Sequence, residues 1–161
     1  MIKILITGGA GNVGGALARK LVENLNYFVV IVDDLSTGST TKLPSKNHSN
    51  WSFVNCDVNN YKSISEIMLT NHFDYVFHYA AVVGVKRTQE NPIMVLNDIE
   101  GIKNVLQLSK NSSVKRVFFS SSSEVYGEPV DNLKWLVVGV LTKSMAFLHY
   151  CRREWKIDKF R

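Results

Sequence analysis

Three glycines at a spacing of three residues follow the first apolar run of the sequence. Gly8, Gly11 and Gly14 come directly after residues 2–6, and glycines at this spacing let the chain turn tightly and bring backbone N–H groups against a diphosphate. A helix that begins near Asn12 would point the positive end of its dipole at that diphosphate. Glycine-rich turns also occur where nothing binds, so the neighbouring segments have to decide between the two interpretations.

An acidic pair ends the second apolar run. Residues 27–32 lead into Asp33 and Asp34, about 20 residues after the glycine turn, where a carboxylate can accept both hydroxyls of an adenosine ribose. Its charge would repel a 2′-phosphate, so the sequence favours NAD over NADP and favours Asp33 over Asp34. A helix or turn cap is the alternative role for Asp33. The hydroxyls of Ser36 and Thr37, in the polar loop that follows, would add ribose or phosphate contacts.

Two later strands bring further polar side chains to the same region. Asp57 belongs to a short strand at 51–58 and would lie near the adenine. A continuous apolar strand at 74–81 ends in small residues, which let a cofactor come close, and it carries His78. That histidine is either a ligand or base, or, more commonly for a lone histidine on a buried strand, a hydrogen-bonded packing residue.

The fifth apolar strand, at 114–119, leads into a polar run at 120–127. Parallel sheets bind ligands beyond the carboxyl ends of their strands, so we expect chemistry at this run. A polar strand end with no chemical role is the alternative.

These residues need a sheet that gathers the strand ends, and the order of segments predicts one. The strands alternate with segments of helical periodicity at 13–25, 61–71 and 92–110, over connections too long for hairpins. This order predicts an α/β domain with a doubly wound parallel sheet and helices on both faces. The helix that Pro92 opens carries two apolar flanks, which implies packing on both sides. At 161 residues the chain fits one domain, 1–161.

The composition argues against several classes of protein. Hydrophobic residues make up 45% and no apolar run approaches the ~20 residues that span a membrane, so we expect a cytoplasmic protein without membrane contact. The net charge of +5 is concentrated at residues 142–161, with six Lys/Arg against two Asp/Glu, which is more typical of a solvated helix face than of a nucleic-acid site. Cys56 and Cys151 lack redox or metal-ligand spacing and are expected to be reduced thiols, and no metal site is indicated.

Five segments together resemble the extended short-chain dehydrogenase/reductases that act on nucleotide sugars, over residues 1 to about 130. They are TGGAGNVGG at 7–15, DDLSTG at 33–38, CDV at 56–58, HYAA at 78–81 and SSSSEVYG at 120–127. The resemblance implies a Rossmann-type fold, tightly held NAD, and a UDP-sugar as the favoured substrate. The implied cofactor contacts are Gly8, Gly11, Asn12, Val13, Gly14, Asp33, Asp34, Ser36, Thr37, Gly38, Asp57, Val58, Tyr79, Ala80, Ala81 and Lys143.

The resemblance also implies a reaction. Members of this family oxidise the sugar at C4, a tyrosinate taking the hydroxyl proton while the hydride passes to the nicotinamide. Ser122 aligns with the residue that hydrogen-bonds the reacting oxygen, and Glu124 with the acid/base glutamate of the dehydratase and decarboxylase branches. The dehydratases carry an aspartate where this chain has Ser123, which counts against a dehydratase. Helices of this family form a dimer bundle, so a homodimer is expected, with ordinary packing on the sheet as the alternative.

The chain departs from the family at its Tyr-x-x-x-Lys motif. Lys143 matches the lysine, but Gly139 stands where the tyrosine belongs, and we expect residues 1–161 to lack the family's substrate-binding part. Three explanations are open: a genuinely tyrosine-less protein, a fragment or internal deletion, or a sequence from which residues have been omitted. A helix stripe is expected at Leu141, Met145, Leu148, Cys151 and Trp155. The first functional hypothesis is the truncated NAD-binding part of a nucleotide-sugar epimerase, with a decarboxylase or dehydratase as the second choice, poorly active or inactive by itself. The second hypothesis is a non-catalytic NAD-binding sensor module.

Overall fold

The computed structural model describes residues 1–82, 85–120 and 138–142. The strands in these ranges are β1 (Ile2–Thr7), β2 (Tyr27–Asp33), β3 (Trp51–Asn55), β4 (Tyr75–His78), β5 (Arg116–Ser120) and β6 (Val138–Thr142). The helices are α1 (Asn12–Leu21), the 3-10 turn η1 (Thr40–Lys42), α2 (Tyr61–Asn71), α3 (Val85–Glu90), α4 (Pro92–Asn97) and α5 (Ile99–Asn111).

One sheet organises the described residues, in the order β3-β2-β1-β4-β5-β6. Strands β1 to β5 run parallel, and Ile4 on β1 pairs with Val29 of β2 on one side and with Tyr75 of β4 on the other. The predicted doubly wound parallel sheet is thereby confirmed. The strand order reverses between β1 and β4, and open α/β sheets bind ligands at such a reversal.

Strand β6 corrects the expected helix stripe at its first residue. Leu141 lies on β6 and pairs antiparallel with Val117 of β5, so the sheet is mixed at this edge. Residues 137–141 read Val-Val-Gly-Val-Leu, and their β-branched side chains favour a strand over a helix. The other residues of the expected stripe, Met145, Leu148, Cys151 and Trp155, lie outside the described residues.

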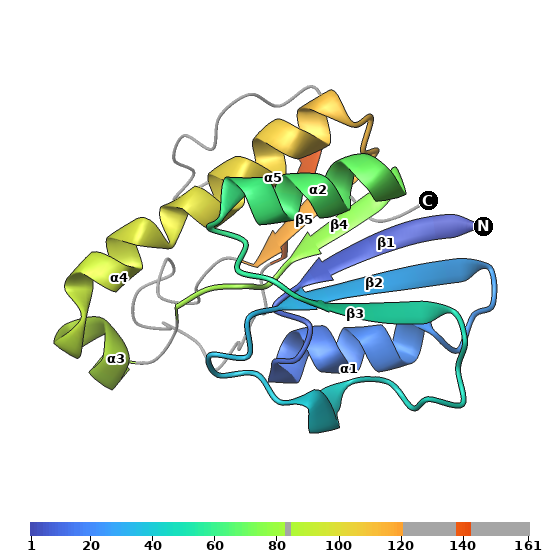
Figure 1. Ribbon diagram of the computed structural model, residues 1–161, viewed down its shortest axis with the longest axis horizontal. Coiled ribbons are helices and arrows are strands. Elements are labelled where there is room, and N and C mark those ends of the chain that lie inside the picture. The colour runs from blue at the N-terminus through green and yellow to red at the C-terminus, as the bar shows by residue number, and fades with distance from the viewer. Residues whose placement is uncertain (83–84, 121–137, 143–161) are drawn as a thin grey trace, which may run out of the picture.

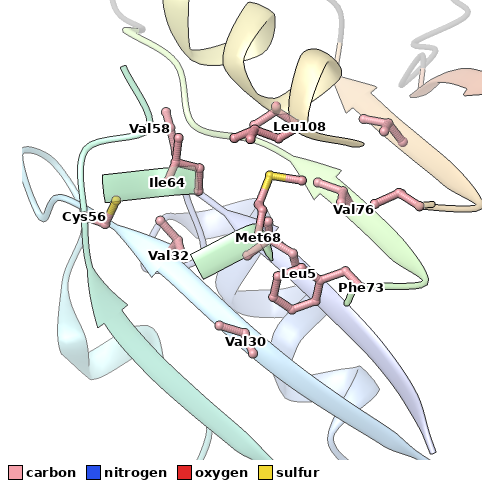
Figure 2. Close-up of a cluster of buried hydrophobic side chains, with 13 residues drawn as sticks. Leu5, Val30, Val32, Cys56, Val58, Ile64, Met68, Phe73, Val76 and Leu108 are labelled. Carbon is pink, nitrogen blue, oxygen red and sulfur yellow. The ribbon is translucent and has the colours of Figure 1, made fainter. Parts of the chain in front are cut away.

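Helices cover both faces of the sheet, as the alternating segments predict. Figure 1 shows α1 beneath the sheet and α2 beside α5 above it. The upper core, drawn in Figure 2, joins strand residues such as Leu5 and Val76 to Ile64 and Met68 of α2 and Leu108 of α5. The lower core is smaller and packs strand residues against α1. The lower residues are Ile4, Ile6, Ala18, Val22, Val29 and Ile31.

The expected single helix from Pro92 is divided at Asp98. This residue ends α4 and precedes α5, and its carboxylate accepts the Val82 N–H at 2.7 Å instead of facing solvent. The Asp98 side chain makes no capping hydrogen bond to α5, and its bond is to the backbone of a segment 16 residues earlier. Only one of the two apolar flanks is covered by described residues, since Ile93 is 71% exposed and Leu96 is 67% exposed. The preceding helix α3 had no counterpart in the sequence pattern.

None of the helices within the described ranges could cross a membrane. The longest of them, α5, has 13 residues, against about 20 for a membrane span. Cys56 is a buried free thiol, and burial followed by the charge of Asp57 raises its pKa. Cys151 lies outside the described residues.

Candidate functional site

The carboxyl ends of the parallel strands bring the candidate residues to one edge of the sheet (Figure 1). The glycine turn follows β1, the acidic pair closes β2, Asp57 follows β3, and Tyr79 follows β4. These four segments are far apart in the sequence, and the parallel pairing alone makes them neighbours. The sequence-predicted cofactor residues before position 82 are thus gathered at the reversal of strand order.

Gly8 lets the turn after β1 approach the end of β4. Its φ of +67° lies in the left-handed region, and a Cβ placed on it would be 2.5 Å from the Ala80 nitrogen. Gly14 is buried on α1, where a Cβ would overlap the carbonyl oxygen of Gly8. The glycine spacing therefore has a packing reason that is independent of any ligand.

The start of α1 offers backbone donors to an anion. Gly11 caps the helix with an extended backbone and no side-chain hydrogen bond. Asn12 and Val13, the first helical residues, are exposed, with Val13 at 54%. The first N–H groups of a helix have no intrahelical acceptor, and the helix dipole makes this end positive. This arrangement suits a diphosphate.

Asp33 connects the glycine turn to the loop after β2. It is 7% exposed, one carboxylate oxygen accepts the Ala10 N–H at 2.9 Å, and the other accepts the Leu35 N–H at 2.8 Å. A Cβ on Gly38 would lie 2.5 Å from Asp33 Oδ1, so the loop closes tightly over the carboxylate. Each oxygen has two lone pairs and keeps one for a further donor. The capping and ligand-binding interpretations are therefore compatible.

The rest of the loop after β2 folds back over the turn. The Ser39 N–H donates to the Ala10 carbonyl at 2.9 Å, and Leu35 adopts a φ of 62° to make the bend. Asp34, Ser36 and Thr37 remain exposed on the outside of this bend, and Asp34 accepts the Ser36 N–H at 2.9 Å. Asp34 thus has a weaker anchorage than Asp33 and more contact with solvent.

Asp57 and Val58 face opposite environments in the loop after β3. Asp57 is exposed and its Oδ1 accepts the Asn59 N–H at 2.9 Å, whereas Val58 is 4% exposed and belongs to the upper core. Figure 2 shows Val58 above Ile64 of α2. Val58 fixes the loop to the core, and the preceding residue, Asp57, presents a carboxylate at the site edge.

Thr7 and His78 hold the loop after β4 from within the sheet. Both are buried, at 0% and 2%, and Thr7 Oγ1 lies 2.8 Å from His78 Nδ1. Thr7 also accepts the Ala80 N–H through its hydroxyl, at 3.4 Å, and the Tyr79 N–H through its carbonyl, at 3.0 Å. His78 further stacks on Phe119, with ring centroids 6.0 Å apart. These contacts agree with the packing role for His78.

The buried imidazole makes stability depend on pH. Burial lowers the pKa of His78 from 6.5 to about 4, so below pH 6.5 the unfolded chain binds a proton that the folded chain does not. The contribution of His78 to the free energy of unfolding is fully present above pH 6.5. About 3 kcal/mol of it is lost as the pH falls towards 4. Urea unfolding at pH 7 and pH 4 measures the loss. A His78→Gln variant is expected to lose about 3 kcal/mol less over this interval, and an equal loss would contradict the assignment.

Tyr79 is unsuited to act as a base. Burial raises the pKa of its phenol above 10.0, so the group stays protonated at neutral pH. Its ring packs beside Phe77, with centroids 6.3 Å apart. The expected catalytic residues Ser122, Glu124 and Lys143 lie outside the described residues. Ala81, another expected contact, is exposed at the site edge.

Position 139 is described, and it lies in a strand. Gly139 of β6 pairs with Phe119 of β5, so residues 139–142 do not form the helix that the Tyr-x-x-x-Lys spacing requires. In the described ranges, no three His, Cys, Asp or Glu side chains form a group that could hold a metal ion. The chemistry that the described residues offer is thus recognition of a nucleotide by backbone N–H groups and carboxylates.

Comparison with known proteins agrees with this arrangement. Residues 4–135 match the model of the NAD dependent epimerase/dehydratase family. A putative UDP-glucose 4-epimerase of Methanocaldococcus jannaschii is 36% identical over 128 residues, which are 78% of this chain and 40% of that protein. A UDP-N-acetyl-alpha-D-glucosaminuronate decarboxylase of Bacillus cytotoxicus is 38% identical over 127 residues, which are 78% of this chain and 38% of that protein.

A solved structure shows the same fold. The UDP-N-acetylglucosamine 4-epimerase of Methanobrevibacter ruminantium, in complex with UDP-N-acetylmuramic acid, superposes with a TM-score of 0.72 at 32% identity. The match covers 83% of this chain and 42% of that one. The chain therefore spans about 40% of the length of the curated relatives it matches. By the family match over most of its length, the chain belongs to the NAD dependent epimerase/dehydratase family.

Proposed function

We propose that this chain is the NAD-binding part of a nucleotide-sugar 4-epimerase. The observation that best supports this proposal is the position of Asp33, a buried carboxylate that is hydrogen-bonded to the glycine turn near the reversal of strand order. An NAD diphosphate would lie at the start of α1 on the N–H groups of Asn12 and Val13, close to Gly8 and Gly14. The Gly11 N–H already donates to the Gly8 carbonyl at 3.1 Å, so Gly11 would contribute close approach of the backbone. The adenosine ribose hydroxyls would donate to the remaining lone pairs of Asp33.

The other expected contacts follow the course of the dinucleotide. Asp34, Ser36, Thr37 and Gly38 would border the ribose, and Asp57 with Val58 would border the adenine. Tyr79, Ala80 and Ala81 would line the half of the site nearer the nicotinamide. Because Asp33 presents negative charge to the ribose, a 2′-phosphate would be repelled, and we propose NAD in preference to NADP.

The family resemblance supplies the proposed chemistry. NAD, when bound, takes the hydride from C4 of the sugar and returns it to the opposite face in an epimerase. Ser122 would hydrogen-bond the reacting oxygen, Glu124 would supply acid/base assistance, and Lys143 would hold the nicotinamide ribose and lower the pKa of a phenol base. No tyrosine stands four residues before Lys143, so turnover is expected to be about 10²- to 10⁴-fold lower than with that base.

A decarboxylase is the second candidate, and a non-catalytic NAD sensor is the third. The Bacillus relative and the alignment of Glu124 with the decarboxylase glutamate favour the second. The glycine at position 139, paired within a strand, favours the third. UDP-sugars are the substrates we propose for either enzyme, because the relatives named above act on or bind them.

Calorimetric titration with NAD and NADP tests the proposal. We expect NAD to bind and NADP to bind more weakly, and absence of NAD binding to a folded chain would overturn the proposal. A coupled assay then measures UDP-galactose to UDP-glucose conversion and release of CO₂ from a UDP-uronic acid. Slow epimerisation supports the first candidate and CO₂ release supports the second. NAD binding without either product is expected both for the third candidate and for a first candidate that is inactive by itself.

We further propose that the protein is a cytoplasmic homodimer. The exposed apolar side chains Ile93, Leu96 and Ile99 lie at the uncovered flank of α4 and α5, and contact with a second copy would remove them from water. Sedimentation velocity at increasing concentration checks this. A Leu96→Glu variant is expected to sediment as a monomer, and an unchanged dimer would contradict a role for this flank.

A further inference from the structure

Asn104 of α5 makes a buried contact with the loop after β3. Its side chain is 5% exposed, and its Nδ2 donates to the Val58 carbonyl at 3.0 Å and to the Asn59 carbonyl at 3.1 Å. Each of the two amide hydrogens therefore has one acceptor. The buried side-chain amide of α5 therefore bonds to two successive carbonyls of a loop that is distant in the sequence.

The helix also leaves room for this loop. A Cβ on Gly101, one turn before Asn104, would lie 2.9 Å from Val58 Cγ2 and 3.0 Å from Asn59 Oδ1. Glycine costs about 1 kcal/mol relative to alanine inside a helix, so its presence here matches the close approach of the loop. The loop thus lies against α5 at both a hydrogen-bonding residue and a residue without a side chain.

The same loop orients Asp57. The Asn59 N–H donates to Asp57 Oδ1 at 2.9 Å, and the carbonyl of Asn59 accepts from Asn104. The two peptide groups of one residue therefore link the buried amide to the exposed carboxylate. A shift of Asn59 would move the donor that sets the direction of Asp57.

We infer that Asn104 is a positioning residue that aims Asp57 at the exocyclic amino group of adenine, and so sets the base preference of the dinucleotide site. The inference rests on the proposed function. A carboxylate accepts from an amino group, whereas the carbonyl at the same position of hypoxanthine would face it without a donor. A residue of α5 would thereby act, through the loop after β3, on which base is accepted.

Nicotinamide hypoxanthine dinucleotide provides the test. Its affinity and that of NAD are measured by calorimetry for the unmodified chain and for Asn104→Leu. A hydrogen bond to a charged group predicts a preference for NAD of about 10- to 100-fold in the unmodified chain. We expect Asn104→Leu to reduce the preference below about 3-fold, because Asp57 loses its fixed direction.

Two controls separate positioning from loss of stability. Ser109→Ala removes a buried hydroxyl from the same face of α5, and that hydroxyl has no hydrogen-bond partner among the described residues. Leu108→Ala destabilises the same core without deleting a contact to the loop carbonyls. Both variants are expected to keep the preference for NAD, since a merely unstable protein binds both dinucleotides with an unchanged ratio in its folded fraction.

Gly101→Ala gives a second, independent disturbance of the loop. It keeps Asn104 but presses on Val58 and Asn59, so it is expected to reduce the preference as well, and it carries the test if Asn104→Leu fails to fold. A preference that survives these changes overturns the inference, as does an unmodified chain that binds both dinucleotides equally. A folded, unmodified chain that binds neither dinucleotide overturns the proposed function itself.

Discussion

Replacing Asp33 with alanine is expected to weaken NAD binding by about 100-fold or more and to lower the free energy of unfolding by about 2–4 kcal/mol. The stability loss arises because the N–H groups of Ala10 and Leu35 lose their acceptor, in a place that is 7% exposed. The binding loss arises because the ribose hydroxyls lose a charged acceptor. Urea unfolding and NAD calorimetry measure the two effects separately.

Asp34→Ala is the matched control for this prediction. Asp34 carries the same charge one residue later, but it is exposed and its one backbone contact is the Ser36 N–H. Its replacement is expected to change stability by less than about 1 kcal/mol, as for surface sites. A larger loss of NAD affinity in Asp34→Ala than in Asp33→Ala would show that the acidic pair has been assigned in the wrong order.

The buried position also modifies what an arginine at position 33 would do. The sequence alone predicts that Asp33→Arg weakens NAD binding and improves NADP binding, because the carboxylate is replaced by a cation. The structure adds that the backbone N–H groups of Ala10 and Leu35 would both lose their acceptor. The ratio of the two affinities is still expected to move towards NADP, in a protein that unfolds at lower urea. If the unmodified chain binds NADP more tightly than NAD, the assignment of Asp33 is wrong.

Gly8→Val is expected to abolish detectable NAD binding and to cost about 3 kcal/mol or more of stability. A φ of +67° is strained for any residue with a Cβ and most for a β-branched one, and that Cβ would meet the backbone of Tyr79 and Ala80 at 2.5 to 2.7 Å. These backbone atoms follow β4 directly and are held by hydrogen bonds to Thr7, so they cannot yield as a flexible side chain does. Thermal unfolding by circular dichroism and NAD titration measure the result.

Gly11→Ala tests whether the turn or the ligand sets the need for glycine. Gly11 has an ordinary φ of −78°, and a Cβ there would meet only the Gly8 carbonyl, at 3.1 Å. We expect a loss of stability below about 1 kcal/mol, with a clear loss of NAD affinity because the methyl group narrows the approach to the helix start.

For the first substitution, a Gly8→Val protein that is stable and binds NAD fully would contradict the packing described for the turn.

Most of the fold follows from local patterns. The apolar run at 27–32 and the helical spacing at 61–71 correspond to β2 and α2, and the glycine turn predicts that α1 begins near Asn12, its first residue. These features succeed because local propensity and burial on the sheet favour the same structure.

The features that the sequence did not predict depend on partners far away in the chain. Strand β6 forms because β5 offers it an edge to pair with. The spacing that ends at Lys143 predicts a helix, whereas the β-branched run before it favours a strand. The long helix is divided at Asp98, whose carboxylate accepts the Val82 N–H from 16 residues earlier. Neither contact leaves a periodic signal in the sequence.

The candidate site shows the same division. The glycines and Asp33 were identified from their spacing, but Thr7, Asp98 and Asn104, which hold the surrounding loops, were not. A signal existed for Thr7, a polar residue at the end of an apolar strand, and for Asn104, an amide on the apolar side of a helix. Their bonding partners lie 16 to 73 residues away, so only the folded structure identifies what they hold.

The first strand of the chain is also the middle of the sheet. Because β1 has β2 on one side and β4 on the other, its amides have the most protected place and are expected to exchange last with deuterium. During synthesis, β1 has to wait for residues 75–78 to leave the ribosome before its second neighbour exists. Until then a mostly apolar strand has one unpaired edge, and the nascent chain is most exposed to aggregation during that interval.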